Sequence, residues 1–567
     1  MTDAAEHSPT DGLPDPFATV RQSVHGADVL VFANPVVGDL RELLQLAEAQ
    51  PPDRSYLIED DRDVRFGELV GRVGGIAAGL LDGCGLRSGD RIAISAANSI
   101  EWALTAWAAV ATGRIVVGLN SWWHPAETLS AIAISTPRVL VLDERQLKRL
   151  APHLAELESV EHILVLGEGT ELSGDPRVRR FDEVCTGEAP LPAADIDPDD
   201  VATILFTSGT TGNAKGVIGT HRAATATYQN VMWAGMRYFP TVFLKAPSGP
   251  PAAPSTVLSA PMFHVAGLQW GVMFGVGMGG TTILNTGRYD PDTVMAMTER
   301  HGCTSLGGVP TMMTRIVDSP TRDRYDLSSV TSVSWGGAPP PTSLIDGCIE
   351  TFPNLVLIGT GYGLTETCGL LLYATGTDYV GQPQTVGKAF PTAEVRVSDP
   401  LDHPLEVGIE GEIQVRGPMV MPGYWERPDA TRDALTEDGW LRTGDLGVID
   451  DNGFVTLTGR AKELIIRGGE NVYPSEIEDV LCNHGAVLDA AVVGRPHPDL
   501  GEEVVAVVQV NTDVDPDELR AWVADRLAGF KVPVEITVHS NPLPRNAAGK
   551  LLRDAIAGGE VRLTETL

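Results

Sequence analysis

Residues Thr207–Gly216 read TSGTTGNAKG and follow a short apolar run, ATILF, at Ala202–Phe206. The ten residues contain three glycines, four hydroxyl side chains and one lysine, Lys215, and they contain no acid. Glycines let a backbone turn its N–H groups toward one point and hydroxyl groups add neutral donors, so the composition suits the oxygens of a polyphosphate. A flexible surface loop can have the same composition. The stretch also differs from the common nucleotide loop, because Gly216 stands where that loop has a hydroxyl residue.

Short apolar runs typical of buried strands alternate with helix-like segments in the first half of the chain. This alternation predicts parallel sheets covered by helices on both faces. Open sheets of this kind bind phosphates outside the carboxyl ends of their strands, so Thr207–Gly216 is expected to connect a strand to a helix opening near His221. The predicted strands are Arg91–Ser95, Ile115–Leu119, Val139–Val141 and His162–Leu166, and the predicted helices are Phe66–Leu81 and Asn98–Ala111.

The overall composition limits the classes of partner. A chain of 567 residues is too long for one hydrophobic core. Its 43% hydrophobic and 21% charged residues are typical of a globular protein. The formal net charge of −33 argues against nucleic acid or an anionic membrane surface, since both would repel it. The six cysteines stand singly, without metal-type spacing, which indicates a reducing, cytoplasmic location.

One long segment, Ala246–Gly287, has no charged side chain of Lys, Arg, Asp or Glu. Its apolar part, Leu268–Leu284, is interrupted by glycines and falls short of the ~20 residues of a membrane span. A buried helix followed by a strand is therefore expected, with no transmembrane segment. The run GVGMGG at Gly275–Gly280 has the form of a dinucleotide fingerprint but lacks the strand–turn–helix order, which makes a dinucleotide-binding module a weak alternative.

Three further clusters of polar, glycine-flanked residues lie downstream of the first stretch. They are GTGYGLTET at Gly359–Thr367, TGD at Thr443–Asp445 and PRNAAGK at Pro544–Lys550. In order and spacing the four clusters resemble the adenylate-forming (AMP-binding) superfamily, in particular acyl-CoA synthetases such as fatty-acid–CoA ligases. The resemblance extends from about Asp39 to Arg553, which is nearly the whole chain.

The resemblance implies roles for side chains in two of these clusters. The ring of Tyr362 would stack on adenine, Asp445 would accept the ribose hydroxyls, and Arg460 would add a second ribose contact. Thr365 would donate to the α-phosphate, and Glu366 would bind Mg²⁺, which usually takes one or two carboxylates. The residues alone leave alternatives open, because Asp445 could be a plain turn aspartate and Glu366 the exposed acid of a tight turn.

The same resemblance gives an ATP-binding set and an acyl pocket. Phe263, His264 and Trp335 would line the pocket, with His264 near the point where carboxylate and α-phosphate meet. A hydrogen-bonded histidine at the end of a strand is the alternative for His264. The expected ATP-binding residues are Thr207, Ser208, Gly209, Thr210, Thr211, Gly212, Lys215, Gly336, Gly337, Ala338, Gly361, Tyr362, Gly363, Asp445 and Arg460.

The C-terminal part is implied to be a mobile domain. Lys550 would be its catalytic lysine, acting with Thr365, Glu366 and His264, although a solvated surface lysine is the ordinary alternative. Lys462 would be the hinge. Gly468 and Gly469 would line a channel for coenzyme A, because glycines allow a thin ligand to pass close to the backbone. Lys531 and Arg467 are weaker candidates for contacts with the phosphates of coenzyme A.

The implied fold is α/β. A large N-terminal domain of layered α/β sheets with a small barrel-like β subdomain spans residues 36–459, after a tail and lead-in at 1–35. A hinge at 460–463 joins it to a small α+β C-terminal domain at 464–567. The implied partners are a small carboxylic acid, ATP, Mg²⁺ and coenzyme A, and a homodimer is compatible with the sequence.

The expected function is an ATP-dependent acyl-CoA ligase that releases AMP and pyrophosphate. Its acid would be a medium- or long-chain fatty acid, or one similarly apolar. Two alternatives stay open at this point. The adenylate could pass to another acceptor, as in an amide synthetase or a stand-alone adenylation enzyme, or the first stretch could serve a phosphotransferase that releases ADP.

Overall fold

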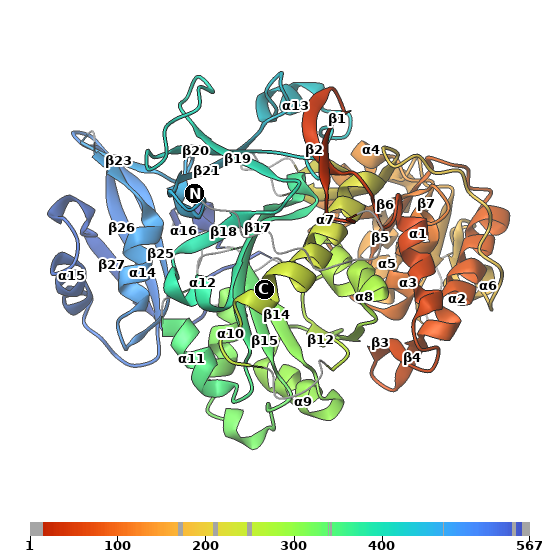
Figure 1. The fold of residues 1–567 in the computed structure, drawn as a ribbon, viewed down its shortest axis with the longest axis horizontal. Helices are drawn as coiled ribbons and strands as arrows, with labels where there is room; N and C mark the ends of the chain where they lie inside the picture. Colours follow the sequence, from red (N-terminus) through yellow and green to blue (C-terminus); the bar gives the residue numbers. More distant parts are fainter. Residues whose placement is uncertain are drawn as a thin grey trace.

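The computed structural model describes residues 15–167, 174–207, 214–246, 252–337, 340, 343–468, 470–546 and 551–557. Within these ranges the chain forms a large α/β part and a small α+β part (Figure 1). The small part, from residue 465 onward, lies at one end of the molecule, in blue at the left of Figure 1. The parallel strands of the N-terminal half lie at the other end. The predicted fold class is confirmed.

A seven-stranded sheet forms the N-terminal half of the described chain, in the order β11-β10-β6-β5-β7-β8-β9. Every neighbouring pair is parallel except β10 and β11. Its inner strands are apolar on both faces, as expected for a sheet covered by helices on both sides. The strands are β5 Arg91–Ser95, β6 Ile115–Gly118, β7 Val139–Leu142, β8 His162–Val165, β9 Val178–Arg180, β10 Val201–Thr207 and β11 Lys215–Thr220.

A second sheet of thirteen strands crosses the middle of the molecule, in the order β19-β20-β21-β22-β18-β17-β16-β15-β14-β12-β13-β3-β4. It is parallel from β3 to β16 and antiparallel from β16 to β19, and the antiparallel end is the β subdomain expected from the sequence. The strands are β3 Ser55–Glu59, β4 Arg62–Arg65, β12 Ser255–Leu258, β13 Thr281–Leu284, β14 Ser305–Gly308, β15 Ser332–Gly336, β16 Leu357–Leu364, β17 Gly369–Thr375, β18 Thr385–Ala389, β19 Glu394–Ser398, β20 Gly411–Arg416, β21 Leu441–Ile449 and β22 Val455–Arg460. A separate hairpin pairs β1 Thr19–Val24 with β2 Ala27–Phe32.

Helices cover both sheets, and several of them begin at a side-chain cap. Ser99, for example, accepts a hydrogen bond from the backbone N–H of Trp102 and starts α3. The α-helices of the large part are α1 Leu40–Gln45, α2 Phe66–Ala78, α3 Ile100–Val110, α4 Pro125–Ser135, α5 Glu144–Leu150, α6 Phe181–Val184, α7 His221–Trp233, α8 Phe274–Met278, α9 Pro291–His301, α10 Pro310–Val317, α11 Ser343–Thr351, α12 Gly376–Gly381 and α13 Pro428–Ala434. The π-helices are η2 Gly79–Gly83, η4 Ala234–Tyr238 and η6 Ala266–Met273, and the 3₁₀-helices are η1 Leu46–Ala49, η3 Ala151–Glu156, η5 Phe239–Thr241, η7 Arg322–Arg324, η8 Thr365–Thr367 and η9 Gly529–Lys531.

The small part is built on a five-stranded sheet with the order β24-β23-β26-β25, and β27 also pairs with β26. Its core contains apolar side chains of the sheet and of two helices. Its elements are β23 Ile465–Arg467, β24 Glu470–Val472, α14 Pro474–Cys482, β25 Val487–His497, β26 Gly501–Val510, α15 Pro516–Ala524, β27 Glu535–His539 and α16 Arg553–Ala557.

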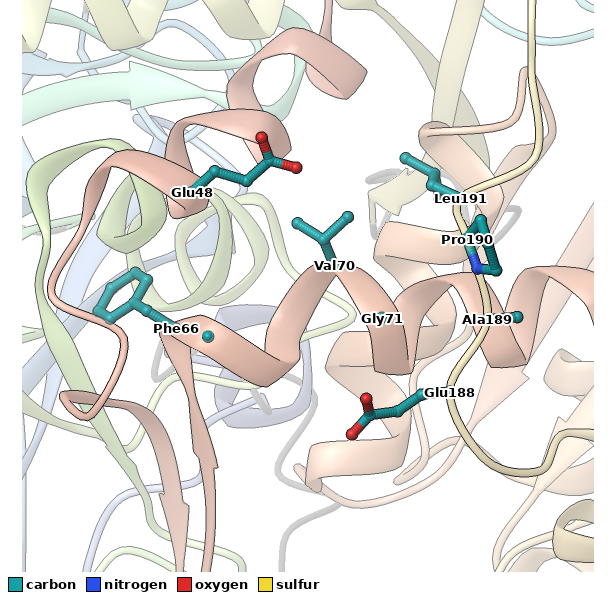
Figure 2. Close-up of a pocket in the computed structure, with 9 residues that line it drawn as sticks. Glu48, Phe66, Val70, Gly71, Glu188, Ala189, Pro190 and Leu191 are labelled. Atoms are coloured by element: carbon teal, nitrogen blue, oxygen red, sulfur yellow. The ribbon is translucent and has the colours of Figure 1, made fainter.

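The glycines of α2 allow an extended segment to lie directly on that helix. A Cβ atom at Gly74 would lie 2.0 Å from the carbonyl oxygen of Ala189, so no larger residue fits there. Beside this contact is a surface hollow of about 600 Å³, which Figure 2 shows with the exposed carboxylates of Glu48 and Glu188. The hollow contains none of the residues predicted for the nucleotide, and its two carboxylates would repel phosphate. We therefore do not assign the nucleotide to it.

The structure corrects one prediction about the Thr207–Gly216 stretch. It connects β10 to the antiparallel strand β11, and the helix α7 begins only after β11. The sequence KGVIGT of β11 contains two glycines and was not recognised as a strand, because it gains its strand character from pairing with β10.

Three further predictions concern the end of one helix, the glycine-rich apolar segment and membrane spans. Helix α2 ends at Ala78 and continues as the π-helix η2, where the sequence predicted one helix to Leu81. The Gly275–Gly280 run lies at the end of α8 before β13, so a buried helix followed by a strand is confirmed. In the described part of the chain, helices long and apolar enough to cross a bilayer do not occur.

Candidate functional site

The base of the Thr207–Gly216 stretch is a β-hairpin. Thr207 ends β10 and Lys215 begins β11, and the two residues are paired across the antiparallel ladder. Directly paired residues present their side chains on the same face of a sheet, so this ladder fixes the side on which Lys215 emerges. The predicted phosphate contacts between them, Ser208, Gly209, Thr210, Thr211 and Gly212, lie outside the described residues.

Residues 421–425, which read MPGYW, lie along the free edge of β11. The backbone N–H of Trp425 donates to the carbonyl oxygen of Gly216 at 2.7 Å, and that of Ile218 donates to Gly423 at 3.2 Å. The segment therefore continues the hydrogen bonding of the sheet beyond its last strand.

Tyr424 in this segment contacts two predicted site residues. Its hydroxyl donates to Oε1 of Glu366 at 2.9 Å. The ammonium of Lys215 lies 4.8 Å from the centroid of its ring, a distance typical of a cation–π contact. Lys215 and Glu366 are 151 positions apart in the sequence, and the structure brings both to one phenol side chain.

The turn that carries Glu366 is fixed on both sides. Thr367 is fully buried; its hydroxyl accepts from the N–H of Leu364 at 2.9 Å and lies 2.8 Å from the carbonyl oxygen of Gly369, to which it donates. The carbonyl oxygen of Glu366 accepts from the N–H of Met421 at 2.8 Å. Thr365 and Glu366 are half-buried in this turn and occupy adjacent positions in η8.

Tyr362, Asp445 and Arg460, the residues predicted to contact adenosine, form a connected group. Asp445 is only 3% exposed and accepts a hydrogen bond from the Tyr362 hydroxyl at 2.5 Å. Its Oδ1 lies 2.9 Å from Nε of Arg460, which is its partner across the β21–β22 ladder. Burial, followed by the charge of Asp445, raises the pKa of Tyr362 well above its usual range, so the phenol stays a donor.

Four predicted glycines lie at the adjoining ends of β15 and β16. Gly336 and Gly361 are paired in register, and a Cβ atom at Gly336 would lie 2.8 Å from the carbonyl oxygen of Gly361. Gly337 has a φ of +82°, which favours glycine. A Cβ atom at Gly363 would lie 1.9 Å from Gly369. These strand ends therefore require glycine, because neighbouring backbone fills the space of a side chain or the backbone has a positive φ. Ala338 lies outside the described residues.

His264 lies just before the π-helix η6. π-helical turns are frequently found at functional sites. Its Nδ1 accepts from the N–H of Ala266 at 3.4 Å, and its side chain is half-buried. The neighbouring Phe263 packs against the end of β6, since a Cβ atom at Gly118 would lie 2.9 Å from the Phe263 carbonyl oxygen. Gln269 of η6 donates to Sγ of Cys368 at 2.9 Å and so joins this helix to the Glu366 turn.

Trp335 is placed differently from the other predicted pocket residues. Its side chain is 3% exposed, and its Nε1 donates to the Tyr379 hydroxyl at 3.0 Å in the core beside α12. Its contact with an acyl group stays a prediction.

The predicted hinge is an exposed turn between β22 and β23. Lys462 lies in this turn, and the next residue, Glu463, pairs through Oε2 with Nε of Arg553 at 2.9 Å. Gly468 follows β23 with a φ of +61°. Gly469 and the predicted catalytic Lys550 lie outside the described residues.

Comparison with known proteins identifies the family. A family model described as AMP-binding enzyme matches residues 44–425, and a model of the AMP-binding enzyme C-terminal domain matches residues 476–550. The first match alone covers more than half of the chain. The chain belongs to the AMP-binding enzyme family. It is therefore a member of the adenylate-forming, acyl-CoA synthetase-like superfamily that its sequence resembles.

Individual relatives support the same superfamily. A long-chain-fatty-acid–CoA ligase of Yersinia pestis is 30% identical over 93% of this chain and 95% of its own length. A feruloyl-CoA synthase of an Amycolatopsis species is 33% identical over 88% of this chain and 93% of its own. The structure of the amide bond synthetase McbA from Marinactinospora thermotolerans superposes with a TM-score of 0.78 at 28% identity, covering 92% of this chain and all of that one. The enzyme class that the ligase relatives support is an AMP-forming acid–CoA ligase.

The donor set of this AMP-binding enzyme fits a magnesium ion held partly by substrate. Groups of three or more His, Cys, Asp or Glu side chains that could hold a metal do not occur among the described residues. Mg²⁺ keeps several waters and usually binds one or two carboxylates together with substrate phosphates. The single carboxylate of Glu366, close to the base of the Thr207–Gly216 stretch, matches that pattern.

The weaker candidates for contacts with coenzyme A already have partners. The Lys531 ammonium lies 2.6 Å from Oε2 of Glu476, and Nη1 of Arg467 donates to the carbonyl oxygen of Phe530 at 2.9 Å. An anion that binds Lys531 has to compete with Glu476.

Sequence reasoning missed Tyr424, Gln269 and Glu463 in the AMP-binding enzyme. Tyr424 could have been noticed, because it follows a proline and a glycine beyond the strand GEIQVR. Gln269 is a polar residue in an otherwise apolar, glycine-rich run. Glu463 adjoins the predicted hinge, but its link to Arg553 depends on the tertiary fold.

Proposed function

We propose that this AMP-binding enzyme is an acyl-CoA ligase that works in two steps. In the first step a carboxylate oxygen attacks the α-phosphorus of ATP, and the bond to the pyrophosphate group breaks. In the second step the thiol of coenzyme A attacks the acyl carbon, and AMP leaves with the carboxylate oxygen. In transfers of this kind, the protein contributes to catalysis mainly by positioning the reactants and stabilising charge.

The adenosine end of ATP would bind at the linked Tyr362, Asp445 and Arg460. The Asp445 carboxylate is oriented by two neighbours, so it can accept both ribose hydroxyls without moving. The base would lie beside the paired strand ends that carry Gly336 and Gly361, where the sheet has no bulky side chains.

The phosphate end would bind at the Thr207–Gly216 stretch and Lys215, with Thr365 donating to the α-phosphate. When bound, Mg²⁺ would neutralise phosphate charge, and Glu366 would hold it. His264 stands before η6, which Gln269 joins to the Glu366 turn, and this supports its assignment to the junction of carboxylate and α-phosphate.

Two positions of the small domain would serve the two steps. Lys550 would stabilise charge between the carboxylate and the α-phosphate in the first step. Rotation at Lys462 would then withdraw Lys550 and bring Gly468 and Gly469 to the path of the thiol, as hinges of a few residues can do. The domains of this scheme are 36–459, the hinge 460–463 and 464–567.

The proposed acid is a medium- or long-chain fatty acid or one similarly apolar. Phe263 and the apolar face of η6 support this choice, because a carboxylate near His264 would direct its chain toward them. The six cysteines are free thiols, four of them with pKa values that burial raises to about 12, which suits a reducing compartment such as the cytoplasm.

The observation that carries the proposal is the convergence of Lys215 and Glu366 on Tyr424. A cation for phosphate and a carboxylate for metal, set side by side at the base of a glycine–hydroxyl loop, are the parts a pyrophosphate-releasing site needs. The test is product analysis with ATP, MgCl₂, coenzyme A and a series of saturated and aromatic acids. The proposal predicts AMP, pyrophosphate and an acyl-CoA in equal amounts.

A second candidate is an amide synthetase that uses the same adenylate. It is favoured by the likeness to the amide bond synthetase McbA over 92% of this chain. Acid-dependent AMP release that yields an amide with added amine and no acyl-CoA would favour it. Release of ADP would instead indicate a phosphotransferase and would contradict both candidates.

A further inference from the structure

Tyr424 joins the two charged side chains assigned to the phosphate end of the site. Its hydroxyl donates to Oε1 of Glu366 at 2.9 Å, and its ring faces the Lys215 ammonium 4.8 Å from the centroid. The side chain is partly buried between these two groups.

The backbone around Tyr424 is held from three directions. Val217 of β11 forms a β-bridge with Tyr424, and the Tyr424 N–H donates to the Thr431 hydroxyl at 2.9 Å. Met421, three residues before it, donates its N–H to the carbonyl oxygen of Glu366 at 2.8 Å. One short segment thus fixes the strand that carries Lys215 and the turn that carries Glu366.

We propose that Tyr424 is a positioning residue that couples metal binding by Glu366 to phosphate binding by Lys215. This inference rests on the proposed function. The tyrosine hydroxyl engages Oε1 and orients the carboxylate, so Oε2 is the oxygen presented to a divalent cation. The orientation is set before the cation arrives, which lowers the entropy lost when it binds.

The ring acts on Lys215 in a different way. A carboxylate partner would compete with phosphate for the ammonium, whereas an aromatic face holds it and leaves its charge in place. In the described part of the chain, no ion pair to a carboxylate is formed by Lys215. The two halves of the tyrosine therefore have separable effects, the hydroxyl on metal and the ring on phosphate.

Two substitutions separate the hydroxyl from the ring. Tyr424→Phe keeps the ring beside Lys215 and removes the hydrogen bond to Glu366, and Tyr424→Leu removes both. Tyr238→Phe is the matched control, since it removes a 2.6 Å bond from a tyrosine to Asp378 at a place that has no predicted site residue. Thermal unfolding of each variant checks that the fold is retained.

The measurement is ATP binding by isothermal titration calorimetry, without an acid substrate, in MgCl₂ and separately in EDTA. We expect Mg²⁺ to tighten ATP binding by the wild type and by Tyr238→Phe. In Tyr424→Phe, the increase in ATP affinity caused by Mg²⁺ should be about tenfold smaller than in the wild type, the usual effect of losing a hydrogen bond to a charged group. Its affinity for ATP in EDTA should equal that of the wild type. Tyr424→Leu should also bind about threefold to tenfold more weakly in EDTA.

A Tyr424→Phe variant with the wild-type gain from Mg²⁺ would overturn this inference and leave the proposed function standing. Equal losses in Tyr424→Phe and Tyr424→Leu under both conditions would overturn the separation of hydroxyl and ring. A wild-type protein that binds no ATP with or without Mg²⁺ would overturn the proposed function itself.

Discussion

Glu463 and Arg553 form an ion pair, with Oε2 and Nε 2.9 Å apart, that ties the predicted hinge to the small domain. Two residues earlier, the N–H of Ala461 donates to the carbonyl oxygen of Gly444 in the large domain at 3.0 Å. Lys462 is the residue between these two anchors. We therefore expect the proposed rotation of the small domain to change the backbone torsions at Lys462.

The first prediction concerns this rotation. Lys462→Pro fixes φ at the hinge, so we expect the rate of thioester formation from supplied acyl-AMP to fall about 10-fold or more while adenylate formation is retained. Lys462→Ala, which keeps the backbone free, is the control and should differ little from the wild type. The two half-reactions are followed separately by pyrophosphate release and by mass spectrometry of acyl-CoA. A Lys462→Pro enzyme that forms the thioester at the full wild-type rate would show that residue 462 is not the hinge.

The second prediction concerns the catalytic lysine. Lys550→Ala should slow adenylate formation by about 10²–10³, the scale for losing one charge-stabilising group. Thioester formation from supplied acyl-AMP should be nearly unchanged, because Lys550 is withdrawn in that step. Lys148→Ala, which removes a surface lysine paired with Glu144 on α5, is the control. Equal loss in both half-reactions would reject the scheme of two domain positions.

The third prediction concerns the ribose site. Asp445→Asn removes the negative charge that pairs with Arg460 and should raise the KM for ATP about tenfold. Tyr362→Phe keeps the ring and removes only the hydrogen bond to Asp445, so its effect on KM should be smaller. Initial rates over a range of ATP concentrations give both values. An Asp445→Asn enzyme with the wild-type KM would place the ribose elsewhere.

How much of this was predictable from sequence depends on how local each feature is. The strand Arg91–Ser95 was predicted with its exact bounds, because a continuous apolar run between turn residues determines it. The edge strand β11 was missed, since two glycines obscure its pattern and its partner β10 supplies its hydrogen bonds.

The site shows the same division. Tyr362, Glu366 and Asp445 were assigned from short motifs that resemble those of the family, and the structure links Tyr362 to Asp445 by a hydrogen bond. Tyr424 could not be assigned, because its role depends on two contacts with residues 58 and 209 positions away in sequence. Contacts of this kind arise only when the sheets have formed.

The fourth prediction concerns stability in acid. His221 is fully buried at the start of α7, its Nδ1 accepts from the N–H of Leu40 at 3.1 Å, and burial lowers its pKa from 6.5 to about 4. Between these two pKa values, His221 binds a proton in the unfolded chain but not in the folded protein. The contribution of His221 is therefore complete above pH 6.5 and falls by roughly 3 kcal/mol as the pH drops toward 4, at 1.36 kcal/mol per pKa unit.

His221→Asn tests this prediction, because an asparagine oxygen can accept from Leu40 and does not titrate. Thermal unfolding of wild type and variant is compared at several pH values between 7 and 4. The midpoint of the wild type should fall more steeply than that of His221→Asn. Parallel curves for the two proteins would show that His221 is not the acid-sensitive group.

The central claim is that a carboxylate oxygen bonds to the α-phosphorus of ATP, and oxygen-18 labelling tests it most directly. An acid labelled in its carboxylate is incubated with the enzyme, ATP, MgCl₂ and coenzyme A, and the nucleotide and phosphate products are analysed by mass spectrometry. The account predicts one labelled oxygen in AMP and none in pyrophosphate. Unlabelled AMP, or ADP together with labelled inorganic phosphate, would contradict it.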